Sequence, residues 1–547
     1  MAEAVAPQVF TRRASGLVRV MSPYSAFIYN VLTMGLIFPW TYVWAPTAFQ
    51  GSNLVLGIVF AFLFELPIAL AYVWLATALP RSGGDYVFQS RVFGGGFGFT
   101  VVFAFFVVWI LQWVALSGWL MAVLGIAPTL LGLGVTLESQ ALIDAGAWAA
   151  SSNGIIVISI LNAALSLVLL VTGFRNYVRF QYVMWYAILA SFAVMLILFF
   201  TTSAGEFQSS LNGFAAATDG TQGFFATAKA AAADAGVNFN PPFWLFGTLM
   251  VAPIAWTSLQ WATYSSEQGG EIKNANVFRS QVFIIVGSLA FTAALLILLA
   301  QAMQSGIGQD GIMVASSGYW YLVPEAKLVE GVVPLMPNLI AIALTSSPIL
   351  IGIIGVGYIL NSFQIVCNCY IGTTRIMVAQ GLDGLLPDWF ARVHPRWKTP
   401  VNAHIAYFLA AIPVIWGYNK IGEWFRWTLG ITFANGAVMT LSALAAALLP
   451  YRAAKVYEAS PGVEYKLGTT PMVTVIGGLG FLLGAFMVGS FLFVDNLGLA
   501  ASINGWFPYY IVLGTALFGL LVYLVMRQVR AGAGLKVEYA FREIPPE

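Results

Sequence analysis

An acidic residue, Glu65, lies inside a long apolar stretch of this sequence, residues 54–78. Burying a charge in lipid is costly, so an ionisable group in such a stretch is a candidate for function. Glu65 could carry a proton, being protonated in an apolar interior and releasing the proton when that interior opens. It could equally be a structural group bonded to a neighbouring helix, because Pro67 leaves backbone groups to be satisfied nearby.

Polar residues interrupt three further apolar stretches. Residues 30–39 combine asparagine, threonine, glycine and proline, and residues 252–260 combine a proline with three polar side chains. Asn361 and Ser362 form an adjacent polar pair in a third stretch. One interpretation is a proline kink satisfied by Thr and Ser, together with ordinary hydrogen bonds between helices, worth about 0.6 kcal/mol each. The other is a set of interrupted helices that bind a ligand.

The elements that must position these residues are apolar helices. Of 547 residues, 60% are hydrophobic and 8% are charged, whereas about 25% are charged in a typical soluble domain. Runs of about twenty apolar residues are long enough to cross a bilayer. The expected crossings lie near residues 22–46, 54–78, 97–125, 154–173, 180–201, 243–265, 281–303, 348–378, 401–419, 428–450, 471–493 and 508–527. The sequence therefore predicts an all-α integral membrane protein with about twelve transmembrane helices.

The basic residues predict the orientation of these helices. If the N-terminus lies inside, 20 of the 24 Lys and Arg residues face the cytoplasm, and only Lys229, Lys327, Lys420 and Arg426 lie outside. The positive-inside rule favours this arrangement over its inverse. We therefore expect a multi-pass protein of the cell membrane with both termini in the cytoplasm.

Several other classes of protein have little support. Nothing in the composition indicates nucleic-acid binding. The chain has two histidines, His394 and His404, both near the cytoplasmic end, so a transmembrane haem held by two histidines is excluded, and no cysteine cluster could hold iron and sulfur. Cys367 and Cys369 are expected to be inert core residues. The lipid bilayer is the expected environment, and no cofactor is expected.

Two cytoplasmic loops carry extended motifs. The first loop contains Pro80, Gly83, Gly84, Tyr86, Phe88 and Arg91. The second contains Arg375, Met377, Ala379, Asp383, Gly384, Pro387, Phe390, Thr399 and Pro400, and a shorter segment contains Glu271, Lys273 and Asn274. Alone, the first string could be an ordinary turn between helices. In order and spacing, the three together resemble signatures of the amino acid–polyamine–organocation transporter superfamily, although Ala275 stands where proline is usual. Of the family's G-x-G-I-F motif in the first helix, this chain keeps only Gly35-Leu36-Ile37-Phe38.

The resemblance implies a LeuT-type fold with two inverted repeats of five helices, broken first and sixth helices, and two C-terminal helices. Ends of broken helices attract the carboxylate and the ammonium of an amino acid. The implied divisions are a cytoplasmic N-terminal segment (1–21), the repeats (22–201 and 243–450), an extracytoplasmic loop (202–242), an outer capping segment (304–347), two further helices (451–527) and a cytoplasmic tail (528–547). We expect residues 202–242 to form a partly helical cap and residues 332–345 a re-entrant or surface helix.

The resemblance also implies a set of site residues. The expected substrate-binding residues are Asn30, Thr33, Met34, Gly35, Trp113, Ser117, Trp256, Thr257, Ser258, Gln260 and Asn435. Asn361 and Ser362 correspond in position to the polar pair that holds Na⁺ in sodium-coupled members of the fold, and Glu65 is the candidate for H⁺. Residues 180–201 contain no lysine of the kind found in some proton-coupled relatives. The lack of an acidic residue at either break weighs against strongly cationic substrates.

The sequence therefore predicts a secondary active transporter, not an enzyme, that carries an amino acid or a related amine by alternating access. Symport and antiport both remain open. The alternative is a receptor or accessory subunit that keeps the transporter fold without transporting.

Overall fold

The computed structural model describes residues 14–36, 40–421, 428–499 and 505–542 of the chain. Helices make up most of these ranges. The one sheet found in them is an antiparallel hairpin of β2 (Lys466–Leu467) and β3 (Thr470–Pro471), and β1 (Val333–Pro334) is a two-residue segment. The prediction of an all-α membrane protein is confirmed.

Ten helical segments in the described ranges are long and apolar enough to cross a membrane. Each corresponds to one of the crossings expected from the sequence. In chain order they are α4 (Leu54–Ala78), the helix from α6 to α8 (Gly95–Thr136), α10 (Ser152–Val171), α11 (Phe174–Thr201), the helix from α15 to α16 (Phe278–Gly306), α20 (Pro348–Leu382), α21 (Val401–Lys420), α22 (Thr428–Arg452), α24 (Met472–Phe493) and α26 (Phe507–Gly532).

The helix from α6 to α8 is longer than the expected residues 97–125. It comprises α6 (Gly95–Val102), η1 (Phe103–Val108), α7 (Ile110–Leu120), η2 (Met121–Ile126) and α8 (Ala127–Thr136), where η1 and η2 are π-helical. Pro128 cannot donate a backbone hydrogen bond to the carbonyl of Leu124. That carbonyl instead accepts a hydrogen bond from the Asn338 side chain. The helix can therefore continue past the proline.

The remaining two expected crossings are those that the sequence marks as interrupted. The first is split into α1 (Pro23–Met34), α2 (Trp40–Val43) and α3 (Ala45–Ala48). The second consists of α14 (Leu245–Leu259) followed by the 3₁₀ helix η3 (Gln260–Glu267). Within the described residues, all twelve expected segments contain helix, and these two are the ones not formed by a single long helix.

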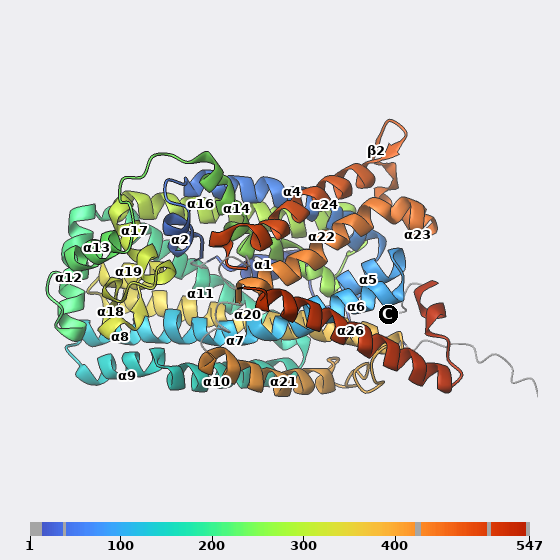
Figure 1. Cartoon of the computed structure of the whole chain (residues 1–547). Coiled ribbons are helices and arrows are strands. Elements are labelled where there is room, and N and C mark those ends of the chain that lie inside the picture. The colour runs from blue at the N-terminus through green and yellow to red at the C-terminus, as the bar shows by residue number, and fades with distance from the viewer. Residues whose placement is uncertain (1–13, 37–39, 422–427, 500–504, 543–547) are drawn as a thin grey trace, which may run out of the picture.

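A cap of short helices covers one end of the bundle, at the left of Figure 1. It consists of α9 (Gln140–Ala150), α12 (Ala204–Asp219), α13 (Phe224–Asp234), α17 (Gly308–Trp320), η6 (Pro324–Ala326), α18 (Leu328–Gly331) and α19 (Pro337–Ala343). The expected helical cap over residues 202–242 is confirmed. The helix expected in residues 332–345 is only α19, which is buried against α8 and α20.

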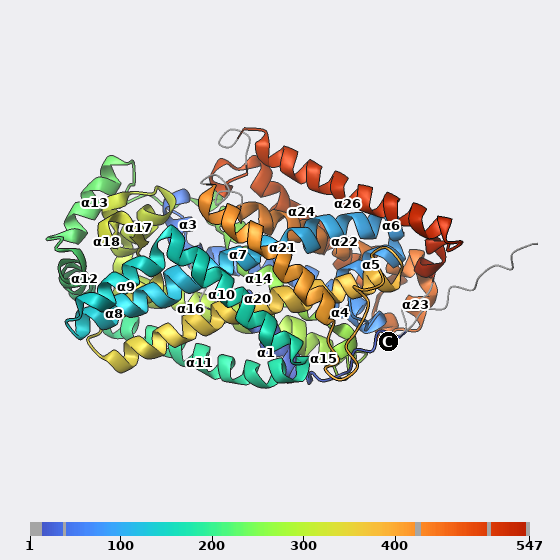
Figure 2. The ribbon, with the colours of Figure 1, turned by 90° about the horizontal axis from the view of Figure 1, so that it is seen from below.

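The opposite end of the bundle, which we call the motif end, carries the three sequence motifs. It contains α5 (Gly84–Val92), η4 (Gly269–Glu271), α23 (Ala454–Glu458), η8 (Pro461–Glu464) and η10 (Val537–Arg542). The short η9 (Asp495–Leu497) follows α24. Figure 2 shows α26 along one edge of the bundle. Only 6% of the most apolar 18-residue stretch of this helix is buried. Nearly all of α26 is therefore available to lipid.

Small residues let the central helices approach one another. A Cβ atom placed on Gly57 of α4 would lie 2.4 Å from the Val251 side chain of α14, and one on Gly477 of α24 would lie 2.7 Å from the Ala443 carbonyl of α22. Close backbone approach of this kind is typical of helix packing in membranes. It brings α4, α14, α22 and α24 into one tightly packed group.

Candidate functional site

In the first interrupted crossing, helix α1 ends at a glycine. Ser22 caps α1, Pro23 occupies the first turn, and Gly35 ends the helix with φ of 72°. This left-handed conformation is costly for any residue with a Cβ atom. Thr33 and Met34, both expected to contact substrate, are buried in the last turn. Residues 37–39, which complete the expected motif, lie outside the described residues.

The second interrupted crossing differs from the expectation. We expected a break within residues 252–260, but α14 is a continuous α-helix through Pro253 to Leu259, and the geometry changes to 3₁₀ only at Gln260. The Thr257 hydroxyl donates to the Ile254 carbonyl at 2.6 Å, as in an ordinary kinked membrane helix. A 3₁₀ stretch in mid-helix often marks a hinge.

Around this change of geometry, three of the expected substrate residues are buried. Both amide atoms of Gln260 are buried without a hydrogen-bond partner. Ser258 is buried beside it in sequence, and the Thr257 carbonyl accepts a hydrogen bond from the Trp261 indole at 3.1 Å. Gln260 is therefore the member of this group with unused hydrogen-bonding capacity.

Two asparagines that we expected to bind substrate donate hydrogen bonds to backbone carbonyls in π-helical segments. Asn30 donates to the carbonyl of Ile284 at 3.2 Å, in η5 (Val282–Gly287), and Asn435 donates to the carbonyl of Phe105 at 2.8 Å, in η1. Asn338 makes the same contact with Leu124 in η2, where Pro128 also removes the N–H that would otherwise bond this carbonyl. A π turn leaves such a carbonyl without its usual helical partner. These asparagines therefore join helices at places where the α-helical pattern fails.

Asn30 also ties the two interrupted crossings together. Its amide nitrogen donates to the Ser265 hydroxyl at 3.0 Å, and its amide oxygen accepts from the Ser265 backbone N–H at 2.8 Å. Because both atoms of the amide are occupied, Asn30 holds α1 against η3. The two segments that interrupt their helices are direct neighbours in space.

An aromatic cluster packs between α1, the helix from α6 to α8 and η3. Tyr29 stacks on Tyr264 with ring centres 5.9 Å apart, and Phe106 stacks on the same ring at 5.9 Å. Trp113 meets Trp261 edge to face at 5.5 Å. Of these residues, only Trp113 was expected at the site. The others were missed because aromatic residues are common throughout this sequence.

Ser117 lies one helical turn beyond Trp113 on α7. It is fully buried, and its hydroxyl has no hydrogen-bond partner among the described residues. Like Gln260, it has a polar group free to bind a ligand.

Glu65 and Trp256 form a direct contact between α4 and α14. The indole N–H of Trp256 donates to Glu65 Oε2 at 2.5 Å, and both side chains are fully buried. The expectation that no acidic residue lies near the sixth-helix interruption is therefore wrong. Sequence reasoning missed this contact because the two residues are 191 positions apart. A second buried acid, Glu267, lies at the end of η3.

The predicted ion-binding pair does not contact α1 through any hydrogen bond that the structure describes. The Ser362 hydroxyl donates to the Tyr358 carbonyl of its own helix at 2.9 Å, and Asn361 Oδ1 is buried without a partner. The residue of α20 that reaches α1 is Asn368. Its amide donates to the Thr33 hydroxyl and its oxygen accepts from the Tyr177 hydroxyl at 2.5 Å.

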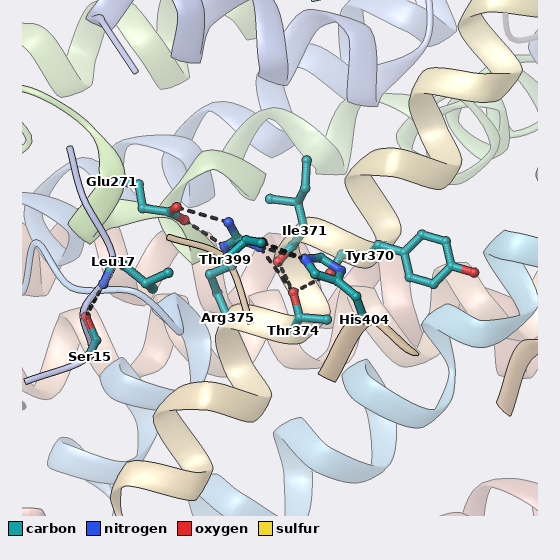
Figure 3. A network of polar contacts seen from close by, with 9 residues as sticks. All are labelled: Ser15, Leu17, Glu271, Tyr370, Ile371, Thr374, Arg375, Thr399 and His404. Carbon is teal, nitrogen blue, oxygen red and sulfur yellow. Dashed lines mark hydrogen bonds and ion pairs between the residues drawn. The ribbon is translucent and has the colours of Figure 1, made fainter. Parts of the chain in front are cut away.

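At the motif end, a buried ion pair joins two of the sequence motifs (Figure 3). Arg375 donates to the two carboxylate oxygens of Glu271 at 2.6 and 3.0 Å, and neither side chain is exposed. His404 Nε2 lies 3.4 Å from Arg375 and 3.2 Å from the hydroxyl of Thr399. The Glu271 carbonyl also accepts the backbone N–H of Met21 at 3.0 Å. The network therefore holds the start of α1 against α20 and α21.

The first of the three motifs, which contains Tyr86 and Arg91, joins the same end through two further carboxylates, Asp383 and Asp85. Asp383 accepts from the Tyr86 hydroxyl at 2.8 Å and forms an ion pair with Arg91 at 2.7 Å. Asp85 accepts hydrogen bonds from the hydroxyls of Tyr72 and Ser442. Burial raises the pKa of Asp85, although these two hydroxyls act in the opposite direction. The motifs are therefore a connected polar layer, not separate turns.

Two cavities lie away from Trp256, near the ends of the bundle. One, of about 860 Å³, lies at the motif end and is lined by residues including Ser15, Arg392 and Arg530. The other, of about 600 Å³, is lined by residues including Asn53 and Gln304, near the cap. The second cavity adjoins the start of α4 and the end of α16.

Comparison with known proteins agrees with this architecture. The chain matches uncharacterised transporters of Mycobacterium bovis and Mycobacterium tuberculosis with 23% identity over 362 residues, which is 66% of this chain and 66% of each relative. It also matches an uncharacterised protein of Sulfolobus islandicus rod-shaped virus 1 with 31% identity over 87 residues, 16% of this chain and 22% of the viral protein. The sequence profile described as "Amino acid permease" matches residues 23–526. This chain therefore belongs to the amino acid permease family.

Proposed function

We propose that this permease is a secondary active transporter that carries an amino acid or a related amine across the cell membrane by alternating access. The observation that carries the proposal is the pairing of the two interrupted crossings. Among the described helices, the crossings formed by α1 to α3 and by α14 with η3 are the two that are not single long helices, and Asn30 joins them. Such paired interruptions supply the site in transporters built from inverted repeats.

The proposed substrate site lies beside this pair. Gly35 ends α1 with a left-handed turn, and Gln260, Ser117 and Asn435 each keep a buried polar atom without a partner. Freed backbone groups near Gly35 would hold the carboxylate or ammonium of the substrate, and the side chains would set its orientation. The charge distribution supports an orientation with both termini and the motif end in the cytoplasm.

Sodium is one candidate for the ion that is coupled to transport. Asn361 keeps a free buried oxygen on α20, which suits a cation that is coordinated by oxygen atoms. The proton is the other candidate, and Glu65 would bind it.

A thermal-shift screen of the purified protein against amino acids, polyamines and nucleobases, with and without sodium, tests the substrate class. A ligand present at 100 times its Kd stabilises the folded state by about 2.7 kcal/mol. Hits are then tested for uptake into proteoliposomes. Accumulation of an amino acid or amine supports the proposal, whereas stabilisation without uptake across the panel would indicate the alternative, a receptor that keeps the transporter fold.

A further inference from the structure

Glu65 is a carboxyl group in the middle of the bundle with one described hydrogen bond. It is the twelfth of 25 residues in α4 and is fully buried. Oε2 accepts from the Trp256 indole, and Oε1 has no hydrogen-bond partner in the described structure. Half of the hydrogen-bonding capacity of this carboxyl is therefore unused.

The helices around Glu65 supply no charge to balance it. Among the elements that pack against α4, the sequences of α14, α16, α24 and η5 contain no charged or titratable residue. The titratable or charged residues of the other packed elements lie toward the motif end, and they are Tyr451, Arg452, Arg279, Tyr264, Glu267 and Glu464. On α4 itself, Tyr72 lies about 10 Å farther along the helix axis and bonds Asp85.

An ionised carboxylate in this position would lose its hydration and recover a single hydrogen bond. One hydrogen bond does not compensate for the burial of an unpaired ion. The packed arrangement therefore favours the neutral, protonated form of Glu65. Ionisation requires water or a new partner to reach the carboxyl.

Trp256 contacts Glu65 on one side and α22 on the other. Its ring packs against Gly436 of α22, where an added Cβ atom would lie 2.5 Å from the ring and 3.3 Å from Gln260 Oε1. The same ring donates to Glu65 on α4. Trp256 therefore lies between α4 and α22, one turn before the change to 3₁₀ geometry at Gln260. A movement of α14 at this hinge would withdraw the indole from Glu65.

We propose that Glu65 is a proton-binding site whose protonation is linked to the seating of Trp256. A proton from solution converts the Glu65 carboxylate to the carboxylic acid, and Trp256 seats on the neutral group. When Trp256 withdraws, the acid releases the same proton to the solution that reaches it. Because linkage is reciprocal, protonation favours the seated ring as strongly as seating favours protonation. The use of this site for coupled transport rests on the proposed function above, but the proton site itself does not.

Infrared spectroscopy of the purified protein tests the site without a substrate. A protonated carboxylic acid has a carbonyl-stretch band that a carboxylate lacks. We expect this band at neutral pH in the wild type and a loss of its Glu65 component in Glu65→Gln, whose amide can still accept from Trp256. Glu464→Gln, the same change at an exposed carboxylate, is the matched control. Asp85→Asn and Glu267→Gln identify any contribution from the buried acids outside the ion pairs. A wild-type spectrum identical to that of Glu65→Gln at neutral pH would overturn the proposal.

Trp256→Ala tests the linkage. This variant removes the ring that excludes water from Glu65, so the Glu65 band should disappear at a lower pH than in the wild type. An unchanged titration would show that the seating of the ring and the proton are not linked.

Proteoliposomes test the coupling. With a mixture of radiolabelled amino acids and an imposed pH gradient, wild-type uptake should increase at least several-fold, and uptake by Glu65→Gln should not respond to the gradient. An infrared band that depends on Glu65, without gradient-driven uptake by the wild type, would refute the coupled function alone. Equal gradient stimulation in both proteins would refute the coupling role of Glu65.

Discussion

Removal of Arg375 should destabilise the motif end by an amount that the structure allows us to estimate. Both members of the Glu271–Arg375 pair are fully buried, and two hydrogen bonds join them. Arg375→Met keeps the aliphatic part of the side chain but leaves the Glu271 carboxylate buried without its partner. Breaking a buried pair from one side costs about 3–5 kcal/mol. Replacing both residues, as in Glu271→Met with Arg375→Met, should recover most of this loss, because no unpaired charge remains.

Equilibrium unfolding of the detergent-solubilised protein by sodium dodecyl sulfate, followed by tryptophan fluorescence, measures these free energies. Thiol labelling provides a second readout. The chain has two cysteines, Cys367 and Cys369, both buried on α20 between the ion pair and the site. In Arg375→Met they should react faster with a membrane-permeant maleimide than in the wild type, because the ion pair no longer holds η4 to α20.

Two results would refute this reasoning. A loss below about 1 kcal/mol in Arg375→Met would mean that water reaches Glu271, since exposed pairs contribute about that much. A double variant as unstable as Arg375→Met would mean that packing by the arginine side chain, which also lies over the Phe174 ring at 4.9 Å, accounts for the effect instead of the unpaired charge.

Three further substitutions test individual site residues. Gly35→Leu should abolish uptake while expression persists, since a left-handed conformation costs an L-residue about 1–2 kcal/mol; retained transport would exclude a site at this turn. Ser362→Ala should weaken sodium stimulation of uptake with little effect on stability, because the hydroxyl bonds only its own helix at Tyr358; unchanged sodium stimulation would exclude an ion site there. Asn435→Ala should lower the free energy of unfolding by about 1–3 kcal/mol, because the Phe105 carbonyl loses its donor; an unchanged stability with impaired binding would instead assign Asn435 to the substrate alone.

Some features of the site were predictable and others were not, as α20 illustrates. The resemblance implied an ion site formed by Asn361 and Ser362 of α20 together with α1, and the described hydrogen bond between these two helices is made by Asn368. Seven residues are two helical turns, so the side chains of Asn361 and Asn368 share one face about 10 Å apart along the axis. The polar face was evident in the sequence. Which residue of this face contacts α1 depends on the position of α1 along the axis of α20.

Asn30 and Asn435 show a similar limit. Their polarity in apolar stretches marked them as candidates, but their partners are carbonyls that become free only where η5 and η1 adopt π geometry. No residue type in these segments predicts a π turn. The partners could therefore be identified only after the helices were placed.

Properties that depend on short stretches of chain could be predicted from the sequence alone. Apolar length and composition predicted the twelve helical segments, and the proline and glycine content predicted the two interrupted ones. Three motifs indicated the family that the profile over residues 23–526 confirms. Tertiary structure decided which side chains meet. Glu65 and Trp256 lie 191 residues apart in the sequence. Successive side chains on a helix differ in direction by about 100°, so their contact depends on the relative rotation and depth of α4 and α14. Packing against Gly57 and the neighbouring helices sets that rotation and depth.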